Sequence, residues 1–268
     1  MSPAAQLSGS RLDGKVALVT GGARGIGKGI ALELADRGAS VVVNYNSSPA
    51  PAKEVVKQIE ALGSKAVALQ ADVSSFDSIV KLYRDALSHF GKLDIVVSNS
   101  GLEHFEAIED VTPEQFDRIF NVNTRGQYFV AQQGYKNIST GGRIIMMSSI
   151  AANLRGIKDH AIYSASKAAI EAMVRSFPSD FSPKRVTVNA VAPGGIETDM
   201  ASENGWRYIP NGSPNMKLES VAEALADNCP LKRFGAPRDV ARVIGFLASE
   251  DGGWVNGQTI TISGGSGK

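Results

Sequence analysis

The sequence predicts an α/β protein with a doubly wound parallel sheet of seven strands in a single domain. Short apolar runs alternate along the chain with longer segments in which apolar residues recur every three to four positions. No internal repeat, low-complexity tract or Pro/Gly/Ser-rich linker divides the 268 residues. Because strands that alternate with crossover helices form parallel sheets, both observations indicate one sheet with helices on its two faces.

The elements follow one another in a regular order. The seven strands are predicted at residues 16–20, 41–44, 66–70, 95–98, 143–148, 187–191 and 259–262. The crossover helices between them are predicted at residues 27–37, 51–62, 76–90, 113–137, 163–177 and 237–248. Pro178 has no amide hydrogen to donate, so we expect it to end or kink the helix that starts at Tyr163.

Two further segments complete the chain. Residues 1–10 lack the pattern of a signal peptide and are expected to form a flexible tail ahead of the domain, which spans residues 11–268. Residues 198–228 form the one long interruption of the βα pattern, and interruptions of this length are usually functional or disordered. They hold Trp206 and Tyr208, so we expect the segment to cover a flat, largely apolar substrate.

The composition excludes several classes of protein. The 28 basic and 27 acidic residues nearly cancel, so we expect neither nucleic acid nor a membrane as a partner. No apolar run approaches the roughly 20 residues that span a bilayer. Cys229 is the only cysteine and the three histidines are scattered, which predicts no disulfide and no metal site. A reducing, cytoplasmic location fits this cysteine usage best.

A glycine-spaced turn directly follows the first predicted strand. Gly21 permits the tight exit from the strand, Gly25 lets the main chain approach a pyrophosphate, and Gly27 lets the next helix pack closely. The amides at the start of that helix would face the phosphates. Strand, turn and helix occur in the order that a Rossmann-type dinucleotide site requires, so the turn predicts a bound dinucleotide cofactor.

The end of the second strand indicates which cofactor is bound. An NAD site normally places an acidic residue there, but this chain has Asn44, Tyr45, Asn46 and Ser47. Neutral donors do not repel a 2′-phosphate, and Arg24 in the glycine turn adds a charge that suits phosphate. The sequence therefore favours NADPH/NADP+ over NADH.

The next two strands supply further candidate cofactor contacts. Asp72 and Val73 follow the third strand and are placed to hold the adenine amine and ring. Asn99, Ser100 and Gly101 follow the fourth strand and are expected to pass beneath a ribose of the cofactor. Ligands of open parallel sheets bind at the carboxyl ends of the strands, where all five of these residues fall.

Tyr163, Lys167 and Ser149 form the candidate chemical centre. A spacing of four places Tyr163 and Lys167 on one face of a helix, one turn apart. The ordinary pKa of tyrosine is near 10, so proton transfer near neutrality calls for a lower pKa, which a neighbouring cation can produce. Ser149 lacks a G-x-S-x-G elbow and a recognised triad, so its hydroxyl is interpreted as a hydrogen-bond donor to a carbonyl oxygen. This set predicts a redox site that protonates an alkoxide.

Taken in order, these motifs resemble the short-chain dehydrogenase/reductase family over nearly the whole chain, from Arg11 to Gly265. The matching stretches are Thr20-Gly-Gly-Ala-Arg-Gly-Ile-Gly27, Asn99-Ser-Gly101, Asn123, Ser149, Tyr163-Ser-Ala-Ser-Lys167 and Pro193-Gly194. The resemblance implies a homotetramer in which the helices that hold Asn123 and Tyr163 pack against a partner subunit.

The resemblance also implies a role for each matching residue. Tyr163 is the proton donor, Ser149 binds the substrate carbonyl, Lys167 lowers the pKa of the tyrosine and binds the nicotinamide ribose, and Asn123 holds a water in a proton relay. The further cofactor contacts that it implies are Ile26, Tyr163, Pro193, Gly194, Ile196 and Thr198. Gly195, Trp206 and Tyr208 join Ser149 and Tyr163 on the substrate side, with Tyr208 stacking on the substrate ring.

Five longer stretches are similar to a fungal branch that holds hydroxynaphthalene reductases, anthraquinone and versicolorin-type ketoreductases and a steroid 17β-hydroxy dehydrogenase. They are Ser98-Asn-Ser-Gly101, Asn123-Thr-Arg-Gly-Gln127, Ala192-Pro-Gly-Gly-Ile196, Tyr208-Ile-Pro-Asn-Gly212 and Asp251-Gly-Gly-Trp254. The implied function is NADPH-dependent reduction of a polyhydroxylated fused-ring aromatic in polyketide secondary metabolism. A steroid or 3-oxoacyl-thioester reductase and a non-catalytic NADP(H)-binding regulator remain the alternatives.

Overall fold

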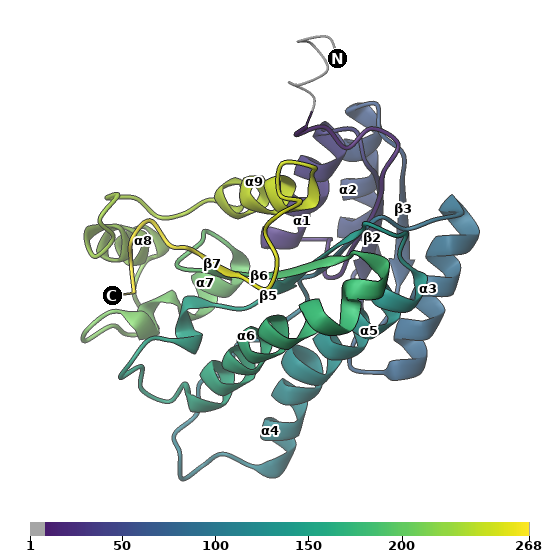
Figure 1. Ribbon diagram of the computed structural model, residues 1–268. Coiled ribbons are helices and arrows are strands. Elements are labelled where there is room, and N and C mark those ends of the chain that lie inside the picture. Colours follow the sequence, from purple (N-terminus) through teal and green to yellow (C-terminus); the bar gives the residue numbers. More distant parts are fainter. Residues whose placement is uncertain (1–8, 268) are drawn as a thin grey trace.

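A parallel sheet of seven strands, in the order β3-β2-β1-β4-β5-β6-β7, forms the centre of the computed structural model, which describes residues 9–267 (Figure 1). The strands are β1 (Val16–Val19), β2 (Ser40–Tyr45), β3 (Ala66–Gln70), β4 (Ile95–Ser98), β5 (Arg143–Met147), β6 (Thr187–Pro193) and β7 (Thr259–Ile262). All neighbouring pairs are parallel, which confirms the predicted fold class. Of the expected tail, residues 1–8 lie outside the described part.

Helices cover both faces of the sheet (Figure 1). They are α1 (Gly25–Asp36), α2 (Pro49–Ala61), α3 (Phe76–Phe90), α4 (Pro113–Phe120), α5 (Gln127–Asn137), α6 (Ala161–Phe181), α7 (Asp199–Asn204), α8 (Leu218–Asp227) and α9 (Pro237–Ala248). Successive side chains of a strand point to opposite faces, so Ala17 of β1 joins a core with α1, α2 and α9. Leu18 joins a second core with α3, α5 and α6. Both faces are buried, which explains the continuous apolar runs of the strands.

The predicted helix over residues 113–137 is wrong in its centre. Residues Asn121–Gly126 form a π-helical turn, η2, between α4 and α5. The wider turn is possible because Gly126 has no side chain, as a Cβ there would lie 2.6 Å from the carbonyl oxygen of Val73. Single π-turns within helices often mark functional sites. This one carries Asn123, which is completely buried.

The helix predicted to end at residue 177 is longer than expected, because α6 continues through Pro178 to Phe181. A proline removes one hydrogen bond, here close to the end of the helix. Phe177 and Phe181, on either side of it, are buried, and their rings stack with centroids 5.0 Å apart. This packing holds the last turn in place.

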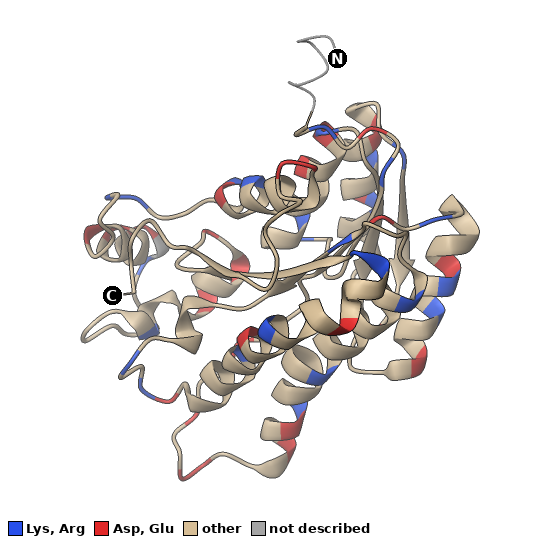
Figure 2. Cartoon of the chain, viewed as in Figure 1, with Lys and Arg blue, Asp and Glu red and all other residues tan. Residues whose placement is uncertain are grey.

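Basic and acidic residues are interspersed along the helices (Figure 2). Among residues 9–267, no helix has the length and apolarity needed to cross a membrane.

Candidate active site

The main cleft, of about 1500 Å³, opens at the carboxyl ends of the strands. β1 lies between β2 and β4 in the sheet. The chain runs outward from β1 to β2 and β3 and then returns to the other side of β1 to form β4, so the strand order reverses between β1 and β4. Open parallel sheets bind ligands in the crevice at such a point. The loops after β1 to β6 all contribute residues to this cleft.

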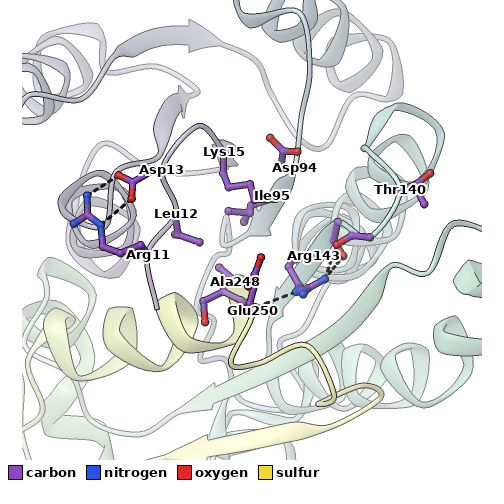
Figure 3. A pocket seen from close by; sticks show the side chains of 13 residues that line it. Arg11, Leu12, Asp13, Lys15, Asp94, Ile95, Thr140, Arg143, Ala248 and Glu250 are labelled. Atoms are coloured by element: carbon purple, nitrogen blue, oxygen red, sulfur yellow. Dashed lines mark hydrogen bonds and ion pairs between the residues drawn. The ribbon is translucent and has the colours of Figure 1, made fainter. Parts of the chain in front are cut away.

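A second hollow, of about 220 Å³, lies at the opposite edge of the sheet (Figure 3). Several of its charged side chains are already engaged: Arg11 pairs with Asp13 at 2.7 Å, and Asp94 accepts the Val16 amide at 2.9 Å. Arg143 donates to the carbonyl of Gly141. No residue of the predicted site lies there, so this hollow belongs to the framework.

The glycine turn has the backbone that a phosphate cradle needs. Gly21 and Gly25 have positive φ values of 61° and 52°, and a Cβ on Gly27 would lie 2.1 Å from the Gly21 carbonyl oxygen. Within the described residues, Arg24 makes no side-chain cap on α1, and the first turn of α1 has no acidic residue. The free amides of this turn and its positive helix end fit the phosphates of a dinucleotide.

The end of β2 has two distinct parts. The Asn44 amide group is buried and used by the fold: its Oδ1 accepts from Gly21, and its Nδ2 donates to the carbonyls of Leu69 and Ala71. Asn44 therefore holds three strand ends together. It also lines the cleft, and its contact with the cofactor stays a prediction. Tyr45, Asn46 and Ser47 line the cleft, as expected.

Arg24 reaches the same corner from the other side. Its side chain is 79% exposed and lies 3.8 Å from Asp199 of α7, so it remains free to turn toward a phosphate. Asp72 and Val73 line the neighbouring wall, and Asp72 accepts two hydrogen bonds from Ser74 at 2.8 Å.

Asn99, Ser100 and Gly101 lie in the middle of the cleft. The backbone amides of Asn99 and Ser100 donate to Thr20 Oγ1, and Asn99 Nδ2 donates to the Thr20 carbonyl at 2.9 Å. A Cβ on Gly101 would lie 3.2 Å from Lys167 Nζ. The segment therefore joins β1 to β4 and leaves room beside the lysine.

Tyr163 and Lys167 project from α6 into the cleft beside Ser149, which lies two residues after the end of β5. Lys167 Nζ donates to the Met147 carbonyl at 3.0 Å and lies 5.6 Å from the centre of the Tyr163 ring. Both side chains are buried. The geometry brings the predicted phenol, ammonium and hydroxyl to one place.

The protonation of this centre differs from the expectation. Burial raises the pKa of Tyr163 above its usual value; the charge of Glu103 adds to this, and a hydrogen bond with Ser149 opposes it. Burial also lowers the pKa of Lys167 to about 8, against the charge of Glu103. Desolvation therefore outweighs the neighbouring cation, and the polypeptide alone does not lower the pKa of the tyrosine.

Asn123 is placed by η2 directly behind this centre. Its Oδ1 accepts from the Leu102 amide, and its Nδ2 donates to the Leu102 carbonyl, both at 2.8 Å. Nδ2 also lies 3.1 Å from Ser166 Oγ. The side-chain amide of Asn123 thus fixes the loop after β4, and its role of holding a water in a proton relay stays a prediction.

Behind Ser149, the structure shows a polar group that sequence reasoning missed. Glu171, one turn after Lys167 on α6, accepts from Asn153 Nδ2 and from Ser148 Oγ at 3.1 Å. Ser148 is thereby turned toward α6. The hydroxyl beside Tyr163 is that of Ser149. The spacing of four between Lys167 and Glu171 was a signal that could have found this network.

The loop after β6 forms the floor between the two ends of the cleft. Pro193, Gly194, Gly195, Ile196 and Thr198 all line it. A Cβ on Gly195 would lie 2.6 Å from the ring of Phe234, so this position needs glycine. Thr198 caps α7 by accepting the Ala201 amide. Both segments are thereby held close to the sheet.

The covering segment places only one of its two predicted aromatic residues in the site. Tyr208 lines the cleft, whereas Trp206 is absent from its lining and packs against Arg207, whose guanidinium lies 4.5 Å from the indole ring. Residues two apart in the short 3₁₀ turn η5 (Gly205–Tyr208) point in different directions, so both cannot face the substrate. The prediction for Trp206 is therefore wrong.

The Tyr208 hydroxyl reaches across the cleft. It lies 2.6 Å from Glu103 Oε1 and 3.0 Å from His160 Nε2. Sequence reasoning treated His160 only as one of three scattered histidines. No group of three or more metal-ligating side chains occurs in the part of the chain that the structure describes.

Comparison with known proteins adds the context of this site. A family described as enoyl-(acyl carrier protein) reductase matches residues 21–266. Among curated proteins, the hydroxynaphthalene reductase-like protein Arp2 of Metarhizium robertsii is 57% identical, over 95% of this chain and 96% of its own. Elsinochrome reductase 1 of Elsinoe fawcettii is 56% identical, over 98% of each chain. Tetrahydroxynaphthalene reductase PfmaG of Pestalotiopsis fici is 52% identical, over 94% and 91%.

Solved structures share the whole fold. A dehydrogenase/reductase from Sinorhizobium meliloti superposes with a TM-score of 0.88 and 34% identity, over 98% of each chain. A short chain dehydrogenase from Burkholderia cenocepacia, in complex with NADP, gives 0.85 and 34%, over 95% and 98%. The angucycline C-6 ketoreductase LanV, with bound NADP, gives 0.85 and 35%, over 96% and 97%.

Proposed function

The chain belongs to the short-chain dehydrogenase/reductase family of oxidoreductases, and from that premise we propose that it is an NADPH-dependent ketoreductase of polyhydroxylated fused-ring aromatics. A hydroxynaphthalene or an anthraquinone/anthrahydroquinone would be the substrate, within polyketide secondary metabolism. The observation that carries this proposal is the identity of 52–57%, over nearly the whole chain, with relatives named for hydroxynaphthalene and elsinochrome reduction. The buried Tyr163–Lys167 pair beside Ser149 supports it.

Each residue of the centre has one task in this reaction. Ser149 donates a hydrogen bond to the carbonyl oxygen of the substrate and polarises it. Tyr163 gives its proton to the same oxygen as negative charge develops there. Lys167, as an ammonium, stabilises the phenolate that remains. NADPH, when bound, supplies the hydride to the carbonyl carbon.

The cofactor would be held by backbone and by neutral side chains. The Gly21–Gly27 turn would hold the pyrophosphate, the Asp72–Val73 segment the adenosine and the Asn99–Gly101 segment a ribose. Arg24, Asn46 and Ser47 would bind a 2′-phosphate, and no acidic residue from position 44 to 47 would repel it. This arrangement supports NADPH, and two of the structural neighbours contain NADP.

The substrate would lie between the chemical centre and the covering segment 198–228. Tyr208 presents an aromatic ring to the cleft, and Gly195 lies on its floor. A flat, fused ring fits such a wall because stacked aromatic surfaces bury a large area at little entropic cost.

We also propose that the chain works as a homotetramer in the cytoplasm. Phe116 on α4 and Tyr128 on α5 are large apolar side chains exposed beside α6. Exposed apolar side chains that gather on one face often mark a subunit contact. Sedimentation equilibrium of the purified protein gives the mass: four chains are expected, and a monomer would contradict this part.

The function is tested by following NADPH oxidation against a panel of substrates. Hydroxynaphthalenes and anthraquinones are expected to be reduced with the highest kcat/KM; steroids and 3-oxoacyl thioesters represent the alternative reductases. Higher kcat/KM for a steroid or a thioester would replace the proposal by that alternative. Binding of NADPH without turnover of any member would indicate a regulator instead.

A further inference from the structure

The mechanism above leaves unused a chain of hydrogen-bonded side chains at the substrate end of the cleft. Glu103 follows β4, His160 precedes α6, and Tyr208 belongs to η5 of the covering segment. The Tyr208 hydroxyl lies between Glu103 Oε1, at 2.6 Å, and His160 Nε2, at 3.0 Å. His160 Nδ1 lies 2.9 Å from the His104 carbonyl oxygen. This series of hydrogen bonds joins the covering segment to the opposite wall of the cleft.

Aromatic packing holds two of these residues, His160 and Tyr208, in place. The Phe105 ring stacks on His160 with centroids 4.1 Å apart and meets the Tyr208 ring edge-on at 5.5 Å. The Arg207 guanidinium lies 5.0 Å from the Phe105 ring on the outer side. His160 is also 4.6 Å from the ring of Tyr163. The array therefore borders the proton donor directly.

The number of hydrogens that these contacts require determines the protonation states of Glu103, Tyr208 and His160. A carbonyl oxygen can only accept, so His160 Nδ1 carries a hydrogen. In a neutral imidazole Nε2 is then bare, and it takes the single hydrogen of the Tyr208 hydroxyl. The 2.6 Å contact of Tyr208 with Glu103 must then be donated by Glu103, as a carboxylic acid.

The one alternative with the same number of protons is a charged pair, Glu103 carboxylate and His160 imidazolium. Burial acts against both charges: it raises the pKa of Glu103, and it lowers the pKa of His160 to about 4. Hydrogen bonding with Tyr208 and Asn204 and the charge of Arg207 oppose the raised pKa of Glu103, but burial outweighs them. Within the described residues, Glu103 Oε2 is buried and makes no hydrogen bond of normal geometry. An unpaired buried oxygen costs less on a neutral acid than on a carboxylate, so the neutral pair is favoured.

We propose that Glu103 is a neutral carboxylic acid at working pH and a positioning residue that fixes Tyr208 as the wall of the substrate site. The inference rests on the proposed function, because it assigns Tyr208 to the substrate. A neutral Glu103 also places no negative charge beside Tyr163, whose pKa that charge would raise further. The neutral acid thus positions Tyr208 and also avoids a further rise in the pKa of Tyr163.

Glutamine and leucine separate this role from the alternatives. The amide of Glu103→Gln donates through NH₂ where the acid donates through OH, and it retains a carbonyl oxygen, so it copies the neutral acid. Glu103→Leu keeps similar bulk but removes the hydrogen bond to Tyr208. Tyr208→Phe removes the same bond from the other side. Glu109→Leu, on an exposed part of the same loop, is the matched control.

Steady-state kinetics with a hydroxynaphthalene gives the first measurement. Glu103→Leu and Tyr208→Phe are each expected to raise KM about tenfold with kcat within about twofold, the pattern of lost ground-state binding. Glu103→Gln and Glu109→Leu are expected to match the parent enzyme. If Glu103→Gln is as impaired as Glu103→Leu, the carboxylate charge is what the site needs and the inference is wrong.

A measurement without substrate separates this inference from the proposed function. Trp206 lies two residues before Tyr208, and the only other tryptophan, Trp254, is 99% exposed and can be replaced by Phe. In this background, Glu103→Leu should raise acrylamide quenching of Trp206 about twofold by loosening the turn, and Glu103→Gln should not. Equal quenching in all variants would overturn the inference, whatever substrate the enzyme prefers.

Discussion

The two ends of the cleft are built in different ways. At the cofactor end, the contacts come from backbone: Gly21 and Gly25 at positive φ, the free amides of α1, and strand ends held by Asn44 and Asn99. At the substrate end, they come from side chains of segments far apart in the sequence, such as Glu103, His160 and Tyr208. The first end can serve any dinucleotide enzyme of this fold, whereas the second end selects the substrate.

The largest effect is expected where the two ends meet. Tyr163→Phe removes the proton donor but keeps the ring, so kcat should fall by about a thousandfold or more, while NADPH affinity changes little. Stopped-flow turnover and fluorescence titration with NADPH measure the two quantities. Turnover within tenfold of the parent enzyme would show that the proton comes from another group. Tyr163 would then not be the residue at which the two ends of the cleft meet.

The cofactor end is tested by Arg24→Ala. Loss of one charge-assisted contact to the 2′-phosphate should weaken NADPH binding about tenfold or more and leave NADH binding unchanged. Lys28→Ala, on the following turn of α1, is the control of equal charge. Isothermal titration with both cofactors gives the comparison. An equal loss for NADPH and NADH would mean that Arg24 supports the fold of the turn rather than the phosphate.

The pH dependence of the reaction tests Lys167, which lies where the two ends of the cleft meet. The pKa of Lys167 is lowered to about 8, so its ammonium form is present below that pH and is lost above it. We expect kcat/KM for reduction to fall up to about tenfold for each pH step above 8. Folding should respond with the opposite sign: the unfolded lysine keeps its proton up to about pH 10, so the contribution of Lys167 to stability rises from pH 8 to 10.

Lys167→Met provides the control for both measurements. It should be nearly inactive at every pH, and its thermal midpoint should lack the rise between pH 8 and 10 that Lys167 contributes. A parent enzyme whose reduction rate increases above pH 8 would contradict the lowered pKa of the lysine.

The smallest effect is expected at the outer face of the covering segment. Trp206 packs on Arg207 rather than in the cleft, so Trp206→Ala should change KM for a hydroxynaphthalene less than about threefold. Tyr208→Ala, which removes the wall itself, should raise it more than tenfold. The two variants with one substrate form a direct contrast. Equal effects would mean that both aromatic residues face the substrate, as the sequence alone predicted.

The features that could be predicted from the sequence are those set by local patterns. The strands β3, β4 and β7 and the helix α3 have the predicted bounds, because apolar periodicity and the Ser75 cap are local signals. The glycine turn was equally readable, because the backbone conformation at Gly21 restricts the residue type. The position of the glycine turn after β1 was therefore predicted from the sequence alone.

The features that the sequence did not indicate have a common physical cause. The side chains of Asn44 and Asn123 bond to partners that the fold brings from elsewhere in the chain, which are Leu69 and Ala71 for Asn44 and Leu102 for Asn123. The π-turn η2 depends on a close approach between Gly126 and Val73, and α6 continues past Pro178 because Phe177 and Phe181 are packed. Such contacts have no local pattern in the sequence.

The central claim is that one cleft passes a hydride from NADPH to an aromatic substrate while Tyr163 supplies the proton. It is tested most directly with NADPH that carries deuterium at the transferred position of the nicotinamide and a tetrahydroxynaphthalene as substrate. Mass and nuclear magnetic resonance spectra of the product should place one deuterium on the carbon that bears the new alcohol, and Tyr163→Phe should form no such product. Oxidation of the cofactor without deuterium on the ring carbon would contradict the account.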